Sequence, residues 1–361
     1  MGRVLSPIFF AGALWLPVCV SEAANRDAET YVEAVAAINE SHAKRPGETA
    51  ESALAEKLPR AAVAALMKLI EEESSADTVA ALVECGQAAL DLALIDHFRM
   101  VRQRLLELAP DEAAKLGDAI ARERFVVIGV GALQEGYLDG FADVTDAILD
   151  AYDEVFGFAE WSKVPGKKIR IRVHLVDRIT RPPHFAPQFP YHSEIDMPVV
   201  DPQAFRSPTA QGQMMFYGLC HELGHLIAMW GDRHSMEDHH AWAHYTGVVI
   251  VEHMAKDAKY EQVLTSLRDV RWRSLTVERD KAENRVEPGT GDRAAVMALL
   301  IKLHEVAGPA AIGGALNHMD ERDAGHRINR VRYYSFGDLE KALGAIIDDR
   351  DVRKAVAEVF P

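Results

Sequence analysis

Cysteine is scarce in this 361-residue chain, which contains only three. Cys19 lies in an apolar N-terminal run, so Cys85 and Cys220 are the two that a processed chain would keep. Two cysteines far apart in the sequence do not make the disulfide framework of small secreted domains. We therefore expect stability to come from a hydrophobic core, which a chain of this length is able to bury.

Basic residues are outnumbered as well. The chain has 40 Lys and Arg against 55 Asp and Glu, a formal net charge of −15. A nucleic-acid or anionic-membrane partner requires a basic face, so the composition argues against both. A glycine-rich phosphate loop is also missing, because Gly129-Val130-Gly131 lacks the third glycine at its spacing.

The N-terminus resembles an export signal. Arg3 precedes an apolar run from Val4 to Val20, and small residues follow up to Ala24. This order is typical of a cleaved signal, so we expect residues 1–24 to be removed and the protein to be exported, either periplasmic or secreted. No later segment is expected to be long and apolar enough to span a bilayer.

The remaining sequence changes character near residue 124. Residues 25–123 are rich in Ala, Leu and Glu with helical periodicity, which predicts an N-terminal domain of helical hairpins. Residues 124–205 contain strand-like runs, and residues 206–361 are mainly helical in pattern. The expected fold class is α+β, predominantly α, with a small β-sheet in the second domain.

Individual elements of the sheet-containing part follow from periodicity. Phe125–Val130 is a short β-type run, and an amphipathic helix is expected over about 133–156. Lys168–Val176 alternates polar and apolar residues like a half-exposed strand, as does Tyr191–Val200. Thr180–Pro190 carries four prolines and is expected to be a loop.

The most informative motif is His221-Glu222-Leu223-Gly224-His225. Ser207-Pro208 predicts a helix start before it, and Gly231 suits the end of that helix. Apolar residues recur at helical spacing through the segment: Met215, Phe216, Leu219, Leu223, Leu226, Ile227 and Trp230. On a helix the two imidazoles share one face and can share a metal ion. The glutamate then lies where it can take a proton from a metal-bound water.

A catalytic zinc takes three protein ligands and a water, so a third ligand is needed. Ser235-Met236-Glu237-Asp238 reads as a capping box that starts a second helix. On that helix Glu237, His240 and His244 share one face, and one of them is the expected third ligand. His239 lies off this face and is expected to be solvent-exposed or capping.

The second helix carries a family resemblance. His240-Ala241-Trp242-Ala243-His244-Tyr245 resembles the segment Glu-Gly-Trp-Ala-His-Tyr of the gluzincin metallopeptidases, whose glutamate binds zinc. In this alignment His240 is the ligand and replaces the carboxylate of the family, while Glu237 is the alternative that keeps a glutamate. The alignment leaves His244 to orient a ligand histidine through its ring N–H.

The order of elements over residues 124–361 also resembles the gluzincin catalytic domain. The resemblance implies Zn²⁺ at the site, and it implies that an edge strand before the motif helix receives an extended peptide, here near Tyr191–Pro198. An oxyanion donor is expected too. We take Tyr334 as this donor, and the other candidates are Tyr245, His326, Arg330 and Tyr333.

These features predict an exported zinc metallopeptidase acting on peptides or proteins. Glu222 is expected to be the general base toward water, with His221, His225 and His240 (or Glu237) as metal ligands. The alternative hypothesis is an exported zinc-binding or interaction protein whose peptidase-like domain lacks turnover. Glu222 favours the enzyme, because a structural metal site does not need a base.

Overall fold

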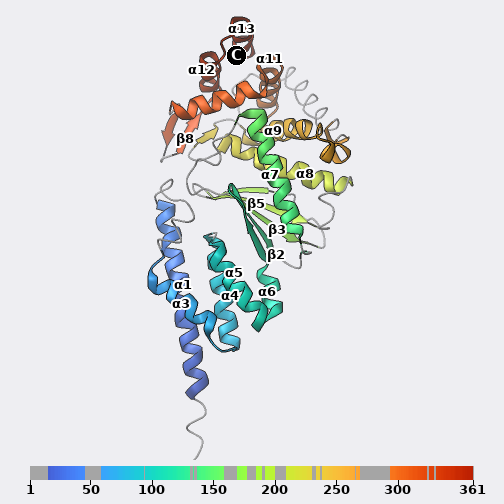
Figure 1. The fold of residues 1–361 in the computed structure, drawn as a ribbon. Helices are drawn as coiled ribbons and strands as arrows, with labels where there is room; N and C mark the ends of the chain where they lie inside the picture. The colour runs from blue at the N-terminus through green and yellow to red at the C-terminus, as the bar shows by residue number, and fades with distance from the viewer. Residues whose placement is uncertain are drawn as a thin grey trace, which may run out of the picture. The chain divides into compact units, whose positions relative to one another are not determined.

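The fold is that of a computed structural model (Figure 1). It describes residues 15–44, 58–92, 94–130, 133, 136–157, 169–176, 184–188, 192–199, 209–229, 233–235, 238–264, 266–268, 293–322, 325–328 and 331–360. The chain divides into two compact units, Met1–Ala119 with Val130–Ala132, and Ile120–Gly129 with Leu133–Pro361. Helices predominate and a small sheet accompanies them, so the α+β class expected from the sequence is confirmed at that level.

The first unit is helical. Its helices are α1 (Trp15–Lys44), α3 (Arg60–Glu71), α4 (Ala76–Asp91), α5 (Ile95–Leu108) and α6 (Pro110–Leu116). Ser75 caps α4 by accepting a hydrogen bond from the Thr78 N–H at 3.0 Å. Helix α4 packs against α1 and α5, as expected of helical hairpins. Residues 1–14 of the expected signal lie outside the described part, and its expected cleavage region lies in α1.

A five-stranded sheet belongs mainly to the second unit. Its strands are β1 (Asp118–Ala121), β2 (Phe125–Val130), β3 (Ile169–Leu175), β4 (His184–Gln188) and β5 (His192–Val199), in the order β1-β2-β3-β5-β4 (Figure 1). Strands β3 and β5 are parallel, with Ile171 opposite Ile195, and β4 runs antiparallel to β5 at the edge. Ile171 and Ile195 are both fully buried, which fixes the register of this pair.

Two expectations about this sheet are wrong. Thr180–Pro190 is not entirely loop, because β4 forms within it. Pro187 is tolerated there since β4 is an edge strand, where a missing N–H need not break a ladder. The strand before the motif helix is not an edge strand either, because β5 has β3 on one side and β4 on the other.

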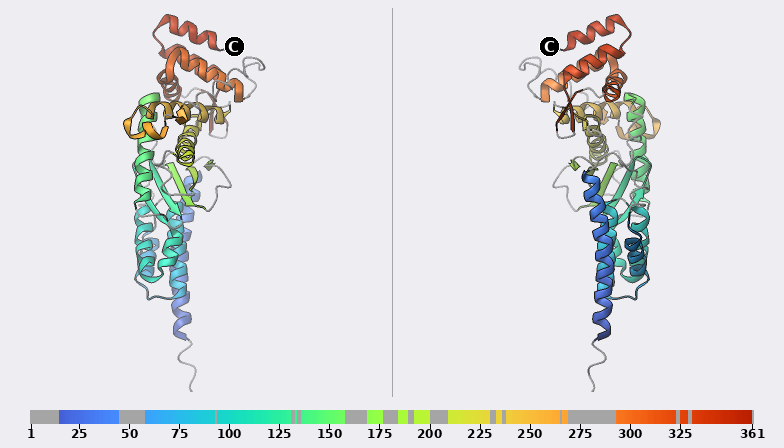
Figure 2. Two further views of the ribbon diagram at one scale, coloured as in Figure 1. Left: turned by 90° about the vertical axis from the view of Figure 1, so that its right-hand side faces the viewer. Right: turned by 90° about the vertical axis from the view of Figure 1, so that its left-hand side faces the viewer.

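The rest of the second unit is mainly helical. Its helices are α7 (Tyr137–Phe156), α8 (Ala210–Met229), α9 (His239–Met254), α11 (Arg293–Glu321), α12 (Phe336–Ile346) and α13 (Arg350–Val359). Both views in Figure 2 show α12 and α13 beside α11, against which they pack. A second small sheet was not expected. It consists of β6 (Arg233–Ser235), β7 (His326–Ile328) and β8 (Val331–Tyr334), in the order β6-β8-β7.

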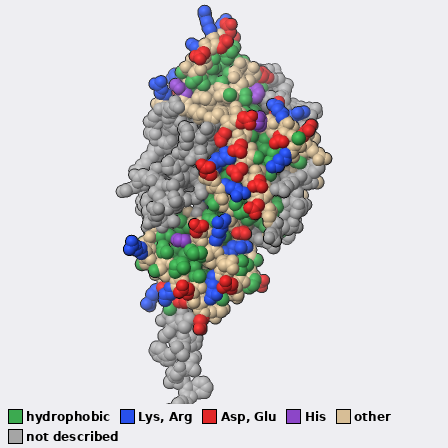
Figure 3. All heavy atoms as spheres, in the orientation of Figure 1, with side chains coloured by type: hydrophobic (Ala, Val, Ile, Leu, Met, Phe, Trp, Pro, Cys, Tyr) green, Lys and Arg blue, Asp and Glu red, His purple; other side chains and the backbone are tan. Residues whose placement is uncertain are grey.

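Charge pairs hold α7 to the start of β2. The Arg124 guanidinium, 13% exposed, lies 2.6 Å from the carboxylate of Asp150 and 3.0 Å from that of Asp153. Arg122 pairs in the same way with Asp143 at 3.0 Å. Figure 3 shows acidic and basic side chains interspersed over the described part of this face. The acidic charge of α7 is therefore partly neutralised by the arginines that precede β2.

One helix in the described part of the chain is long and apolar enough to cross a membrane by length and composition. It is Arg293–Met319 in α11, with a mean hydropathy of 1.5, so the expectation that no segment after the signal meets this requirement is wrong. Gly308, at φ 80°, and Pro309 break the helix in its middle. Leu300 and Leu316 are fully buried in the core of the second unit. Packing in that core accounts for part of the apolar composition of α11, since 44% of the apolar stretch is buried.

Candidate metal centre

Helix α8 carries the motif histidines. It begins at Ala210, where the Thr209 hydroxyl accepts a hydrogen bond from the Gly212 N–H at 3.2 Å. The expected start at Ser207-Pro208 lies outside the described residues. Within α8, apolar side chains such as Leu219 and Leu223 are fully buried. This burial fixes the rotation of the helix about its axis and turns the opposite face toward α9.

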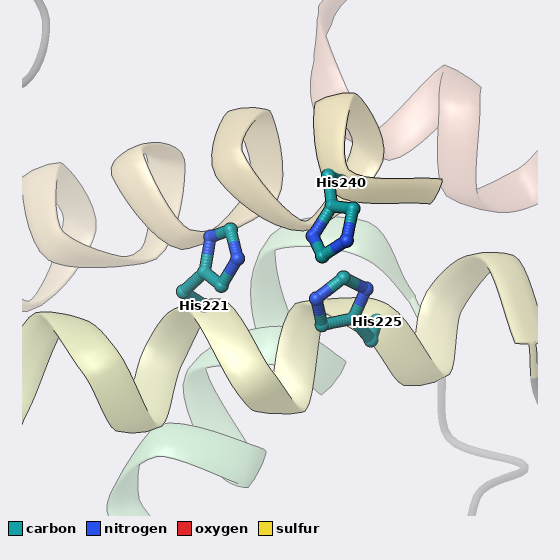
Figure 4. Close-up of side chains that lie close together, drawn as sticks. All are labelled: His221, His225 and His240. Carbon is teal, nitrogen blue, oxygen red and sulfur yellow. The ribbon is translucent and has the colours of Figure 1, made fainter. Parts of the chain in front are cut away.

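Three imidazoles meet between α8 and α9. Figure 4 shows His221 and His225 on α8 facing His240 on α9, and one ring nitrogen from each lies within 4.8 Å of the others. In a tetrahedral site with metal–nitrogen bonds of about 2.1 Å, such nitrogens are roughly 3.4 Å apart. Small side-chain rotations would close this difference. The group could therefore hold a metal ion, and the expectation that these three histidines come together is confirmed.

The electrostatics of the group favour neutral imidazoles. His225 is 2% exposed. Burial is the largest cause of its pKa falling to about 2, and the neighbouring histidines and Arg293 lower it further. Burial also lowers the pKa of His240, followed by the charge of Arg293. Neutral imidazole is the form that binds metals, so the donor set suits a divalent cation. Because His240 itself is exposed, the group is open on that side.

Glu222 lies beside the same group. Its side chain is 7% exposed, and its Oε2 lies 3.7 Å from Nε2 of His225. That separation is too long for a hydrogen bond. The carboxylate therefore stands next to the ring nitrogen of His225 without a direct hydrogen bond to it, which is a suitable place for a group that acts on a water molecule near these imidazoles.

Two glycines set the distance between α8 and α9. A Cβ added to Gly224 would lie 2.5 Å from Oγ1 of Thr246 and 2.9 Å from the carbonyl oxygen of Ala243. A Cβ added to Gly247 would lie 3.2 Å from the backbone of His221. The helix backbones can approach this closely only because both positions lack a side chain. This approach brings His240 within reach of the motif histidines, and the sequence pattern alone does not indicate it.

Helix α9 starts later than expected. Asp238, rather than Ser235, is its N-cap, and its Oδ1 accepts hydrogen bonds from the N–H of His240 at 2.8 Å and of Ala241 at 3.1 Å. Ser235 lies in β6, so the predicted capping box is wrong. Glu237, the alternative third ligand, lies outside the described residues and before the cap.

His239 does not have the role expected from the sequence. Its Nδ1 lies 3.0 Å from Nδ1 of His225, and the two ring centroids are 4.9 Å apart. The ring is partly buried against the ligand group instead of pointing freely into solvent. Its position on the helical face did not reveal this contact, because the contact depends on how α9 crosses α8.

Tyr217 was also missed. It precedes His221 by one helical turn, and its hydroxyl hydrogen-bonds with Nδ1 of His244. The His244 ring centroid lies 6.2 Å from that of His221. His244 thus lies close to the three imidazoles, and its hydrogen bond with Tyr217 holds its ring in place. The four-residue step from Tyr217 to His221 is a signal that the sequence could have offered.

Four of the five proposed oxyanion donors lie among the described residues of the second unit. Tyr245 is fully buried, and its hydroxyl hydrogen-bonds with Nδ1 of His304 at 3.0 Å. Tyr334 is 2% exposed on β8, in the hydrophobic core. His326 on β7 and Tyr333 on β8 are opposite each other in register. Arg330 lies outside the described residues. The role of Tyr334 thus stays a prediction.

The site is therefore a group of three imidazoles, with a buried carboxylate at its side, built on two closely packed helices. Comparison of the chain with protein-family models, with curated proteins and with solved structures finds no match.

Proposed function

We propose that this chain is an exported zinc metallopeptidase in which Glu222 is the general base. The observation that carries the proposal is the buried Glu222 carboxylate, 3.7 Å from Nε2 of His225 and beside the three imidazoles. Three protein nitrogens with an open side are typical of a catalytic zinc site, whereas structural zinc sites are closed by four protein ligands. Zinc bound there would supply a Lewis acid for the peptide carbonyl and lower the pKa of water.

The protein residues would divide the remaining work. Glu222 would accept the proton of the attacking water and pass it to the leaving amine. Its burial excludes bulk water, which strengthens the interaction of the carboxylate with the reacting groups. Tyr217 holds the His244 ring beside His221, so His244 would be fixed in orientation while substrate binds.

The substrate would be an extended peptide lying along β4. The motif resemblance implies binding at a sheet edge, and β5, which was expected to be this edge, has neighbours on both sides. Strand β4 is the edge of the described sheet on the side of α8, which it contacts. Its outer main-chain groups could pair with a peptide, as in other cases of strand addition.

Glu222→Gln tests the proposal directly. The variant keeps the shape of the side chain but cannot accept a proton, so we expect peptide-library hydrolysis to fall by about 10²–10⁴-fold while bound zinc remains. Glu154→Gln, on α7 with a side chain 73% exposed, is the matched control and should keep full activity. Equal hydrolysis by wild type and Glu222→Gln would overturn the general-base role.

A second candidate function rests on one observation. His240 stands where the resembling family has a carboxylate, which is compatible with an exported zinc-binding or interaction protein without turnover. Wild-type protein that holds zinc but cleaves no peptide in the same library digest would favour this second function over the first.

A further inference from the structure

The two ring nitrogens of His225 face different partners. Nδ1 lies 3.0 Å from Nδ1 of His239, and Nε2 lies 3.7 Å from the Glu222 carboxylate. The first distance is that of a hydrogen bond and the second is not. Two neutral imidazole nitrogens can share a hydrogen bond only if one of them carries the proton. The Nδ1 contact therefore requires opposite tautomers on the two rings, Nδ1–H on the donor and Nε2–H on the acceptor.

We propose that His239 is a positioning residue of the metal centre, which accepts the Nδ1–H of His225 and so leaves the Nε2 lone pair of His225 for a metal ion. In the opposite arrangement the proton would sit on Nε2 of His225, beside Glu222, and no lone pair of that ring would remain for the metal. Ligand histidines commonly donate their second ring N–H in this way. The inference depends on the metal site of the proposed function but not on peptide hydrolysis.

The start of α9 explains why two consecutive histidines serve one site. Asp238 binds the N–H groups of His240 and Ala241, which fixes the first turn of the helix. Successive side chains on a helix point about 100° apart. His240 can therefore turn toward the ligand group while His239 lies against the Nδ1 edge of the His225 ring. The ring centroids of His239 and His240 are 4.4 Å apart, and that of His225 is 4.7 Å from His240.

The test reads the tautomer in the metal-free full chain. Long-range ¹H–¹⁵N correlation of ¹⁵N-histidine-labelled protein identifies the protonated ring nitrogen of His225, which is assigned with His225→Gln. We expect Nδ1–H in the wild type. His239→Leu removes the acceptor, so the Nε2–H tautomer should appear and zinc affinity should fall about 10–100-fold.

Two further variants separate positioning from packing. His239→Asn places an amide oxygen where Nδ1 stood, so it should keep the Nδ1–H tautomer and restore zinc affinity to within roughly threefold of wild type. His253→Leu is the control, because His253 lies near the end of α9 and pairs with Glu154. It should change neither the tautomer of His225 nor the zinc affinity. If His239→Leu does not fold, the tautomer of wild-type His225 and the zinc affinity of His239→Asn still test the role of His239.

Three results would overturn the assignment of His239. They are an Nε2–H tautomer in wild-type protein, unchanged zinc affinity in His239→Leu, and failure of His239→Asn to restore the affinity. Failure of the peptidase proposal would look different. Hydrolysis would be missing or independent of Glu222, while the tautomer and the zinc affinity would behave as described.

Discussion

Gly224→Ala should weaken both folding and metal binding, although alanine is the better helix former. The new Cβ would lie 2.9 Å from the carbonyl oxygen of Ala243 and 2.5 Å from Oγ1 of Thr246. The carbonyl belongs to the backbone of α9, so it cannot move aside as the end of a side chain can. Helix α9 would have to shift by roughly 0.5 Å to restore an ordinary contact.

The net effect follows from two opposing contributions. Replacing glycine by alanine inside a helix gains about 1 kcal/mol. Overpacking at a tight contact costs about 1–3 kcal/mol, so the variant should lose up to about 2 kcal/mol of unfolding free energy. A shift of α9 also moves His240 away from His221 and His225. We expect zinc affinity to fall roughly tenfold, because ligands must be held within about 0.5 Å of a productive geometry.

Urea denaturation and a competitive zinc titration measure these two effects. Gly344→Ala is the matched control, because a Cβ there meets nothing within 4 Å, and it should stabilise the protein by about 0.5–1 kcal/mol. Removing Thr246 Oγ1 in a Gly224→Ala/Thr246→Ala double variant should recover only part of the loss, since the Ala243 contact remains. A Gly224→Ala protein as stable as Gly344→Ala, with wild-type zinc affinity, would refute the close-approach argument.

Two further predictions concern the ends and the packing of the same helices. Asp238→Ala should lower the free energy of unfolding by about 1 kcal/mol and weaken zinc binding, because α9 loses its N-cap. Asp238→Asn should keep the cap, and with it most of the stability and of the zinc affinity. Equal thermal midpoints for the two variants would contradict this. His304, bonded to Tyr245, has a pKa lowered by burial, so between that pKa and about 6.5 the unfolded state binds more protons than the folded state. The free energy of unfolding should therefore decrease as the pH is lowered below about 6.5, by at most about 1.4 kcal/mol per pH unit. Urea titrations at several pH values measure this dependence, and an equal change with pH in wild type and His304→Gln would argue against His304 as its origin.

The spacing of apolar residues along the sequence predicted those helices and strands that show a clear periodic pattern. The helical stripe around Leu219 and Leu223 and the alternation in residues 168–176 both correspond to observed elements. Strand β4 was missed because its prolines suggest a loop, and only its pairing with β5 makes it a strand. The three-residue strands β6 and β7 carry too few residues for a period-2 pattern, and β8 brings them together from distant parts of the chain.

The features of the site likewise include some that the sequence predicts and some that depend on tertiary packing. The step of four from His221 to His225 follows from helix geometry alone, and the helix that carries His240 could be found from its own sequence. The contacts of His239 and Tyr217 depend on where α9 crosses α8, which is set by glycines whose partners lie 19 to 27 residues away. A single glycine in a helix pattern does not reveal which backbone it approaches.

The unfavourable electrostatics of the histidine group are themselves an argument for a metal. A pKa of about 2 at His225 means that protonation of this ring is strongly opposed by burial and by its neighbours. As a purely structural network the group would gain only ordinary hydrogen bonds, while acid would drive its members apart. A divalent cation binds the neutral form of all three rings at once and couples α8 to α9 through them. The three histidines thus add little stability as a purely structural network, whereas they form a suitable ligand set for a metal ion.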